Sequence, residues 1–483
     1  MGERFFALTR ALHSLAHMFA SGFFHMKARV IVLLVGISAI LGIGGYAAYR
    51  NPWVRSLFAR SSADPVELER GKKALLKNHA PADAATGYPQ WRGASRTGVA
   101  PVGSFRTDWD KQKPKELWRA NIGGGFGSCA VVDRKLYFQD QLGDKERVVC
   151  LDAETGKTVW DYSYAVGQIG TGRGYENGPR ATPTVVGNMV FTVGGAGKLL
   201  ALEAEGNAIK MRWQHDLLPE FQATMPDWGV ACSPLILGDL VIVLPGGEGA
   251  SVVAFDKTTG DVKWKTGSNP PGYSSPITAS IGGLETVFAF MGDALLAVRP
   301  TDGKLMSSFK WPTQFKGNIT TPIIVDDEYV FISSAYSMGC ALLRAERKGD
   351  EVSLVKVYEN RRNGFATHHA TSVFKDKHLF GIDGTQGERG LKCVDFMTGK
   401  EVPNWDGAET GQASVILAGD HLILQIAKKG EVWLAEANPK EFNLIAKVPK
   451  VLSGNNNWAT PTLVNGRLYL RDEKNVVCLD VRP

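Results

Sequence analysis

A pattern of about 46 residues recurs eight times between residues 115 and 483, and it restricts the fold more than any other feature. Each copy begins with a small residue and Ser or Thr, often followed by Pro. Two short apolar segments separated by a Gly turn come next, and then a third segment that ends in Asp, a Thr-Gly turn and Trp. The copies begin near Ser128, Thr182, Ser233, Ser275, Thr321, Thr371, Ala413 and Thr460.

Four short strands in about 40–50 residues predict one blade of a β-propeller. A single blade cannot bury both of its faces, so blades stack in a ring whose first and last members must join. The eighth copy reaches the C-terminus without a fourth strand, and residues 115–119 (KELWR) have the pattern of that missing strand. We therefore predict an all-β fold, an eight-bladed propeller over residues 88–483, with strand 115–119 closing the last blade.

The copies resemble the pyrroloquinoline quinone (PQQ) repeat of bacterial PQQ-like propellers. The resemblance rests on segments such as CLDAETGKTVW, which ends at Trp160, and AFDKTTGDVKW, which ends at Trp264. Residues 89–98 (PQWRGASRTG) are similar to the entry segment of these proteins. In the family the repeated Trp wedges between neighbouring blades, and the resemblance implies this docking role for Trp118, Trp160, Trp213, Trp264, Trp311 and Trp405.

Two groups of proteins with these repeats differ in function. BamB-like propellers are non-enzymatic scaffolds of outer-membrane protein assembly, whereas quinoprotein dehydrogenases hold PQQ and Ca²⁺ over the propeller axis. The chain lacks the vicinal Cys-Cys pair and the C-x-x-C-H haem motif that are common in the enzymes. The resemblance favours a non-catalytic scaffold or ligand- and protein-binding module of the cell envelope, without a cofactor. The alternative is a PQQ-dependent dehydrogenase that oxidises an alcohol or a sugar.

Residues 30–49 (VIVLLVGISAILGIGGYAAY) contain no charged side chain and are long enough to cross a bilayer as a helix. We expect a single transmembrane span after a basic cytoplasmic segment, 1–29, and before a tether, 50–87. A cleaved signal peptide remains the alternative, and translation could start at Met1 or Met26. By resemblance, the propeller lies on the periplasmic, extracytoplasmic side of the cytoplasmic membrane, where an envelope protein would be its partner.

The positive charge of the chain is confined to its N-terminal part. Residues 1–87 contain 11 Lys and Arg against 5 Asp and Glu, which accounts for the net charge of +6. The remaining residues contain 44 of each sign and are neutral as a group. This distribution fits a segment beside a membrane and gives no sign of a nucleic-acid-binding surface.

The six cysteines are expected to be buried thiols. Cys150, Cys393 and Cys478 occupy the same position of the third strand in different copies. Equivalent positions of different blades are too far apart for a disulfide. Without any C-x-x-C pair, a zinc ribbon or a thioredoxin-type site is also unsupported.

The loops that enter the innermost strands should line one mouth of the central channel. In a functional interpretation, Trp228, Tyr273 and Trp458 provide stacking faces and Arg180 contacts an anion, with Glu176 or Asp227 as a general base or cation ligand. The interpretation that we favour is simpler: polar residues occupy a wet channel mouth, and aromatics pack on blade edges. The ligand-binding candidates are Arg180, Trp228, Tyr273, Asn318, His369, Asn457 and Trp458.

No metal site is predicted from the adjacent pair His368 and His369. Consecutive residues of a strand face opposite ways, so the two rings are not expected to share one ion. No further histidine lies at ligand spacing.

Overall fold

The computed structural model describes residues 87–483, except 102, 104, 176, 363, 404, 406 and 407. The predicted transmembrane helix at 30–49, the segment before it and all but the last residue of the tether at 50–87 lie outside the described residues. Within the described part of the chain, no helix is long and apolar enough to cross a membrane.

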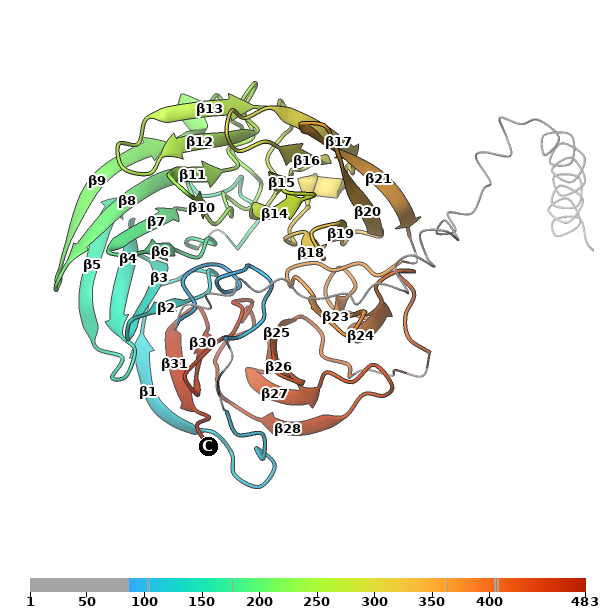
Figure 1. Ribbon diagram of the computed structural model, residues 1–483. Helices are drawn as coiled ribbons and strands as arrows, with labels where there is room; N and C mark the ends of the chain where they lie inside the picture. Colours follow the sequence, from blue (N-terminus) through green and yellow to red (C-terminus); the bar gives the residue numbers. More distant parts are fainter. Residues whose placement is uncertain are drawn as a thin grey trace, which may run out of the picture. The chain divides into compact units, whose positions relative to one another are not determined.

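Eight small antiparallel sheets are arranged in a ring, which confirms the predicted all-β propeller (Figure 1). Each blade starts at its innermost strand, and the chain then proceeds outward from strand to strand. The strands of blades 1 to 4 are β2 (Ala130–Val132), β3 (Lys135–Leu142), β4 (Lys145–Asp152), β5 (Thr158–Ala165), β6 (Thr184–Val186), β7 (Met189–Val193), β8 (Lys198–Glu205), β9 (Ala208–Asp216), β10 (Leu235–Leu237), β11 (Leu240–Val243), β12 (Val252–Asp256), β13 (Val262–Thr266), β14 (Ile277–Ile281), β15 (Leu284–Phe290), β16 (Ala294–Val298) and β17 (Leu305–Lys310).

Blade 6 has three strands within the described residues, and the other blades have four. Two short helical turns, α5 (Leu217–Glu220) and η1 (Gln314–Lys316), lie in loops between blades. The strands of blades 5 to 8 are β18 (Ile323–Val325), β19 (Tyr329–Ser334), β20 (Gly339–Lys348), β21 (Glu351–Asn360), β22 (Val373–Lys375), β23 (His378–Asp383), β24 (Gly390–Asp395), β25 (Ala413–Ala418), β26 (His421–Ile426), β27 (Glu431–Glu436), β28 (Leu444–Val448), β29 (Thr462–Val464), β30 (Arg467–Arg471), β31 (Asn475–Asp480) and β1 (Lys115–Asn121).

The ring is closed by a strand from the start of the described chain. β1 pairs antiparallel with β31, and Lys115 lies opposite Asp480. The strand expected at 115–119 is therefore the outermost strand of blade 8. This pairing removes an open sheet edge from the first and last blades.

Burial across a blade follows the apolar pattern of its strands. All five residues of β16 (ALLAV) are buried, because a middle strand is covered by blades on both faces. In the outermost strand β9 (AIKMRWQHD) exposure alternates, and its one buried residue is Trp213. The core of the propeller therefore lies between blades, and the outer strands bury the aromatic residue that faces the next blade.

Aromatic side chains in or beside the outer strands join neighbouring blades. The Nε1 of Trp213 donates to the carbonyl of Lys257 in the next blade at 3.1 Å, and the indole lies against Gly260. Tyr358 takes this place in blade 5, and its hydroxyl donates to Phe396 O at 2.9 Å. The same contact with a backbone carbonyl of the next blade is made by Trp118, Trp264 and Trp405.

The remaining two tryptophans of the predicted docking set are bound differently. Trp311 donates to the hydroxyl of Ser334 in blade 5 at 3.1 Å, although its ring is fully buried. Trp160 is also buried, but its Nε1 has no hydrogen-bond partner within the described residues. The next blade has a tight hairpin around Gly206 where blades 1, 3 and 6 have a Thr-Gly turn, and no atom outside the hairpin lies within 4 Å of a Cβ placed on this glycine.

The described residues of 88–106, which we call the hub segment, start in the middle of the ring and lead outward to the edge of blade 8 (Figure 1). The side chains of Arg92 and Arg96 are fully buried there, and they donate to backbone carbonyls of blades 3, 4 and 6. Backbone atoms and the Trp91 indole bind the other five blades. The hydrogen-bond partners, one from each blade in order, are Val131, Val185, Ser233, Pro276, Thr321, Thr371, Leu417 and Val481.

The small hydroxyl residues that begin the repeats connect the blades around the axis. The backbone N–H of Thr182 donates to the hydroxyl of Ser233 at 2.9 Å, and Ser233 N–H donates to Ser275 at 2.9 Å. Across the closure between blades 8 and 1, Thr460 N–H donates to Ser128 at 2.7 Å. The repeated Ser or Thr therefore satisfies a buried N–H of the preceding blade.

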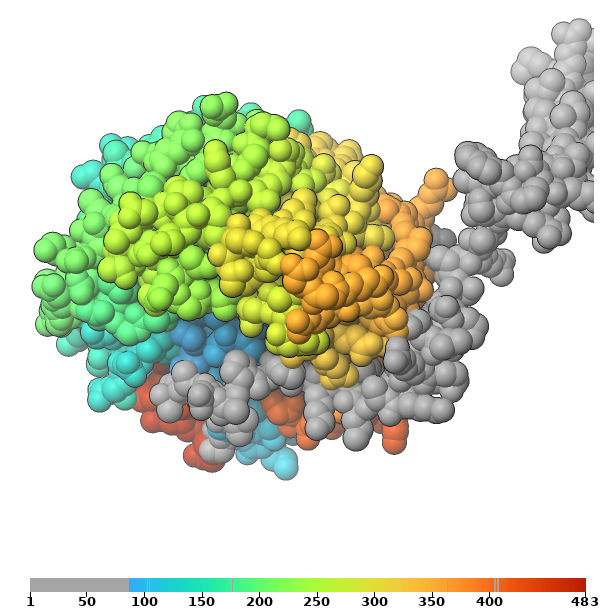
Figure 2. Space-filling model, turned by 45° about the horizontal axis from the view of Figure 1, so that its top comes forward, coloured from blue at the N-terminus to red at the C-terminus, as the bar shows by residue number. Residues whose placement is uncertain are grey.

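The outer strands of blades 4 and 5 lie side by side, seen as the adjoining yellow and orange surfaces (Figure 2). Leu354 N–H donates to the Ser307 hydroxyl at 3.2 Å, which links β21 to β17. The ion pair between Lys304 and Glu351, at 2.6 Å, lies at the exposed end of the same contact. These two blades are thus joined along their periphery as well as at the axis.

All six cysteines are free and buried, as predicted. Burial raises the pKa of each thiol to about 12, so these groups are protonated at neutral pH. They are small apolar core residues.

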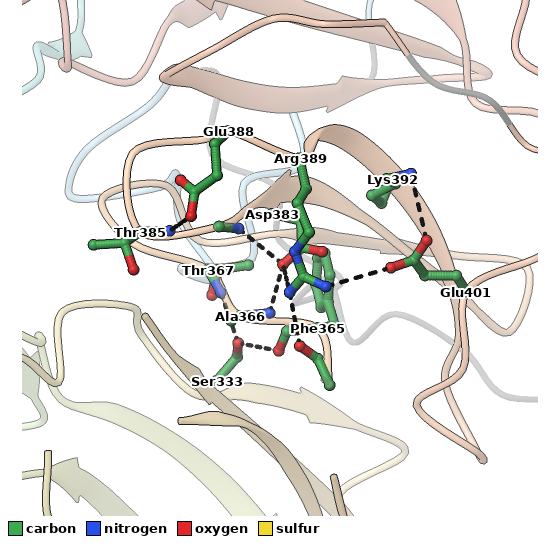
Figure 3. Close-up of polar contacts among 12 residues, drawn as sticks. Ser333, Phe365, Ala366, Thr367, Asp383, Thr385, Glu388, Arg389, Lys392 and Glu401 are labelled. Carbon is green, nitrogen blue, oxygen red and sulfur yellow. Dashed lines mark hydrogen bonds and ion pairs between the residues drawn. The ribbon is translucent and has the colours of Figure 1, made fainter. Parts of the chain in front are cut away.

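A buried carboxylate holds the loop that enters blade 6 (Figure 3). Asp383 Oδ1 accepts hydrogen bonds from the N–H groups of Ala366 and Gly384, each at 2.8 Å, and from the Arg389 guanidinium at 2.8 Å. Its Oδ2 is buried without a partner among the described residues. Burial raises the pKa of this carboxyl to about 6, because the favourable bonds do not fully replace its hydration.

This raised pKa predicts a pH-dependent stability. Between about pH 4 and pH 6 the unfolded chain loses the Asp383 proton while the folded chain retains it, so the folded state loses stability as the pH rises. We expect the free energy of unfolding of the wild type, relative to Asp383→Asn, to fall by about 2 kcal/mol across this window. Denaturant unfolding of both proteins from pH 4 to pH 7 measures the difference. A difference that does not change with pH would contradict the prediction.

Candidate functional site

One mouth of the central channel opens into a cavity of about 750 Å³, which we call the cup. Its floor is formed by Trp91 of the hub segment and by the repeat-start residues Ser233 and Ser275. The Trp91 indole is fixed by a 2.9 Å hydrogen bond from Nε1 to the Thr321 hydroxyl. The walls comprise Phe126, Tyr175, Arg180, Trp228, Ala231, Tyr273, Ile319, Tyr336, His368, His369, Gln386, Gln412, Lys428, Asn455, Asn456 and Trp458.

Five of the predicted ligand-binding residues line the cup: Arg180, Trp228, Tyr273, His369 and Trp458. All five lie in loops that lead into innermost strands, which is the placement expected from the repeats. Two of their backbones are bound to a neighbouring blade, because Tyr273 N–H donates to Asn318 O at 2.9 Å and Trp458 O accepts a hydrogen bond from the Ser414 hydroxyl at 2.7 Å.

The expectation that Asn318 and Asn457 face the channel mouth was wrong. Both side chains are fully buried. Asn318 Nδ2 donates to the carbonyls of Met291 and Trp311 at 2.7 and 3.0 Å, and Asn457 Nδ2 donates to Ala427 O at 2.7 Å. In both cases the amide satisfies backbone carbonyls of the previous blade, and this use of Asn has the same sequence pattern as a channel-facing one.

His368 and His369 lie in a bend before β22, not in a strand, so the reasoning that they face opposite ways was wrong. Their rings stack at 3.9 Å between centroids, and both line the cup. Burial lowers the pKa of His368 to about 4 and also lowers the pKa of His369, so both imidazoles are neutral at pH 7. The described residues contain no group of three side chains able to hold a metal ion.

Trp458 is the centre of a stack of rings. His369 lies 4.6 Å from it at an interplanar angle of 29°, and Phe126 lies 4.9 Å from it at 31°. The predicted stacking face of Trp458 is therefore covered by side chains of its own chain. Trp228 differs, because Tyr273 and Phe315 contact it at steep angles of 54° and 78°. Trp228 is the tryptophan of the wall on which no described ring stacks in parallel.

Of the two candidate acids, only Asp227 lies among the described residues. Asp227 is not part of the cup wall, and its carboxylate is engaged by Arg173 at 2.9 Å and by the Thr171 hydroxyl at 3.0 Å. These bonds make Asp227 an anchor for the 171–173 loop rather than a base facing the cup. Glu176 lies outside the described residues.

The sequence reasoning missed a second set of wall residues. Tyr336, Gln386 and Lys428 lie in the turns between the second and third strands of blades 5, 6 and 7. In an antiparallel blade these turns lie at the same end of the propeller axis as the loops that enter the first strand. The repeat pattern could therefore have predicted these residues as part of the wall. Trp91 was present in the entry segment, but only the structure shows that this segment enters the channel.

The charged residues among the described wall residues are all cationic. Arg180 and Lys428 are the cations, and no described residue of the wall is Asp or Glu. The Arg180 guanidinium lies 5.3 Å from the centre of the Phe126 ring and donates to the carbonyls of Tyr175 and Gly178. The described part of the wall is thus aromatic and cationic, which suits a neutral or anionic ligand.

Eight blades, the docking aromatics between them and an axial cup define a PQQ-like propeller. A family model described as outer membrane protein assembly factor BamB matches residues 82–209 and 145–443, which together span most of the sequence. The chain belongs to this family. No curated protein sequence matches it.

Solved structures with this fold include both groups considered above. BamB from Moraxella catarrhalis is 17% identical with a TM-score of 0.54, and the match covers 76% of this chain and 97% of that one. Quinohemoprotein alcohol dehydrogenase from Comamonas testosteroni is 14% identical with a TM-score of 0.57, and the match covers 83% of this chain and 81% of that one. A europium-containing methanol dehydrogenase is 12% identical with a TM-score of 0.56, and the match covers 80% of this chain and 89% of that one. At these identities the likeness establishes the fold.

The described residues of the cup do not fit PQQ with a bound Ca²⁺. Ca²⁺ takes about six to eight oxygen ligands, with carboxylates prominent among them. The described wall offers amide oxygens but no carboxylate, and its two fixed charges are positive. We therefore derive no catalytic step through this cofactor.

Proposed function

We propose that this protein is a non-catalytic binding module of the cell envelope. The observation that carries the proposal is the composition of the cup: aromatic walls, two cations and no described carboxylate that could act as a base or hold Ca²⁺. Membership of the BamB family supports a role in binding. An envelope protein that contacts the propeller and a ligand in the cup are compatible, because blade edges and the axial mouth are separate surfaces.

The proposal includes attachment to the cytoplasmic membrane through residues 30–49, with the propeller outside the cytoplasm. The uncharged twenty-residue segment and the basic residues beside it support this placement. We expect the full chain to sediment with membranes and to resist extraction by high salt, and a variant lacking 30–49 to be released. Equal sedimentation of both proteins would contradict the anchor.

The alternative, a PQQ-dependent dehydrogenase, is favoured by the shared fold with quinohemoprotein alcohol dehydrogenase. Full-length protein loaded with PQQ and Ca²⁺ separates the two functions in a dye-linked assay on a primary alcohol and an aldose. We expect no turnover above that of protein without PQQ. Oxidation that requires Ca²⁺ and is lost in Asp227→Asn, but not in Asp261→Asn on the outer edge of blade 3, would overturn the proposal.

A further inference from the structure

Three aromatic residues at the mouth of the cup have a backbone conformation that bulky residues rarely adopt. Tyr175, Phe315 and Tyr336 have φ angles of +60°, +57° and +56°. They are the only aromatic residues with positive φ in the described part of the chain. Such conformations cost of order 1–3 kcal/mol and persist where the surrounding structure and function require them. Three separate loops therefore hold strained aromatic residues at one mouth.

These residues extend the wall upward into solvent. Tyr175 is 52% exposed and Phe315 is 36% exposed, although both are large and apolar. Phe315 contacts the edges of Trp228 and Tyr336 at 5.7 and 5.6 Å between centroids, which joins the exposed rim to the deeper wall. The rim thus presents apolar rings above the accessible Trp228 indole.

Polar groups without partners accompany the rings. Gln386 and Asn455 are exposed at the rim, and their side-chain amides make no hydrogen bond within the described residues. Lys428 is also exposed, with no acidic partner in that part of the chain. An amide offers both donors and an acceptor, and an ammonium offers only donors.

This combination points to the chemistry of one ligand class. A pyranose ring has a flat C–H face that packs on an indole, and hydroxyl groups that both donate and accept hydrogen bonds, as amides do. A carboxylate on the sugar would complement the exposed ammonium of Lys428, which has no acidic partner among the described residues. A cavity of about 750 Å³ is within the usual range of small-ligand sites.

We propose that the cup binds a carboxylate-bearing saccharide, with Trp228 as the stacking face, Gln386 and Asn455 as partners of the hydroxyl groups, and Lys428 as the partner of the carboxylate. The proposal rests on the binding role inferred above and names the ligand class of that site. The strained rim residues keep the apolar rings in place before the ligand arrives, which lowers the entropic cost of binding.

Calorimetric titration of the full-length protein tests the proposal with trimers of galacturonic, mannuronic and glucuronic acid, and with neutral maltotriose as the matched control. We expect at least one acidic trimer to bind about tenfold or more tightly than maltotriose at low salt, and this preference to shrink as the NaCl concentration rises. Failure of all three acidic trimers, or equal binding of maltotriose, would overturn the saccharide proposal. Either result would leave the proposed non-catalytic function standing, because that function is tested separately by the dye-linked assay with PQQ and Ca²⁺.

Two pairs of variants locate the binding. Lys428→Gln should weaken the acidic trimer several-fold, whereas Lys429→Gln should not, because Lys429 lies over the Trp433 ring at 5.7 Å. Trp228→Ala should weaken binding about tenfold or more, and Trp228→Phe should restore most of it. Equal effects of the two lysine variants, or full affinity in Trp228→Ala, would show that the saccharide does not bind in the cup.

Discussion

Replacement of Arg96 by alanine is expected to lower the free energy of unfolding by about 4 kcal/mol or more. The guanidinium lies in the centre of the ring, fully buried, and donates to Pro276 O at 2.8 Å and Ser233 O at 3.2 Å, as well as to Pro234 O. Its Nε donates to Gln90 within the hub segment at 2.9 Å. The truncation leaves these buried carbonyls without a donor and creates a cavity between blades 3 and 4.

The charge of Arg96 is stabilised by carbonyl dipoles. No acidic side chain contacts it within the described residues, and burial lowers its pKa to about 10, so it remains protonated at neutral pH. Arg96→Lys keeps the charge but loses the planar fork that reaches two blades at once, and it should recover only part of the stability.

Denaturant unfolding of the full-length protein measures this effect, with Arg134→Ala as the control. Arg134 pairs with Glu154 on the surface, where its side chain is 71% exposed, so its removal should change the stability by no more than about 0.5 kcal/mol. If Arg96→Ala is as mild as the control, the hub segment does not hold the blades together.

The propeller itself could be predicted because its repeats indicate both the number of blades and the strand that closes the ring. The spacing of the repeat starts gave the blade count, and the unpaired eighth copy required a strand such as 115–119 to close the ring. Both inferences depend on hydrogen bonding and burial that every blade must satisfy in the same way. Local patterns are sufficient for such features.

The interior of the channel could not be predicted in the same way. Arg92 and Arg96 are charged residues in a segment without a strand pattern, and only the meeting of eight blades creates the buried carbonyls that accept their hydrogen bonds. Asn318 and Asn457 show the opposite error. Each was predicted to line the channel mouth because it is polar and close to the channel, but its side chain is buried. Contacts that arise from the closed ring have no counterpart in the spacing of residues along the chain.

Replacement of Gly260 by alanine is expected to cost about 3–4 kcal/mol of stability. Gly260 has a φ of +83°, which an alanine adopts only with strain. A Cβ at this position would lie 2.8 Å from the indole of Trp213, which is itself fixed by its hydrogen bond to Lys257. The methyl group would therefore push apart blades 2 and 3 or displace the docked ring.

Gly206 provides a matched control in the neighbouring blade. Its φ is +63°, so alanine suffers comparable backbone strain, but no atom outside the turn lies within 4 Å of the added Cβ. We expect Gly206→Ala to cost only about 1–2 kcal/mol. The difference between the two variants isolates the contact with the docked indole from the conformational preference of glycine. A thermal or denaturant unfolding experiment that finds equal losses would show that the tryptophan does not press on this turn. In that case the repeated Thr-Gly sequence would reflect only the demands of the turn, and the blades would be held together chiefly by the apolar faces between them and by the hub segment.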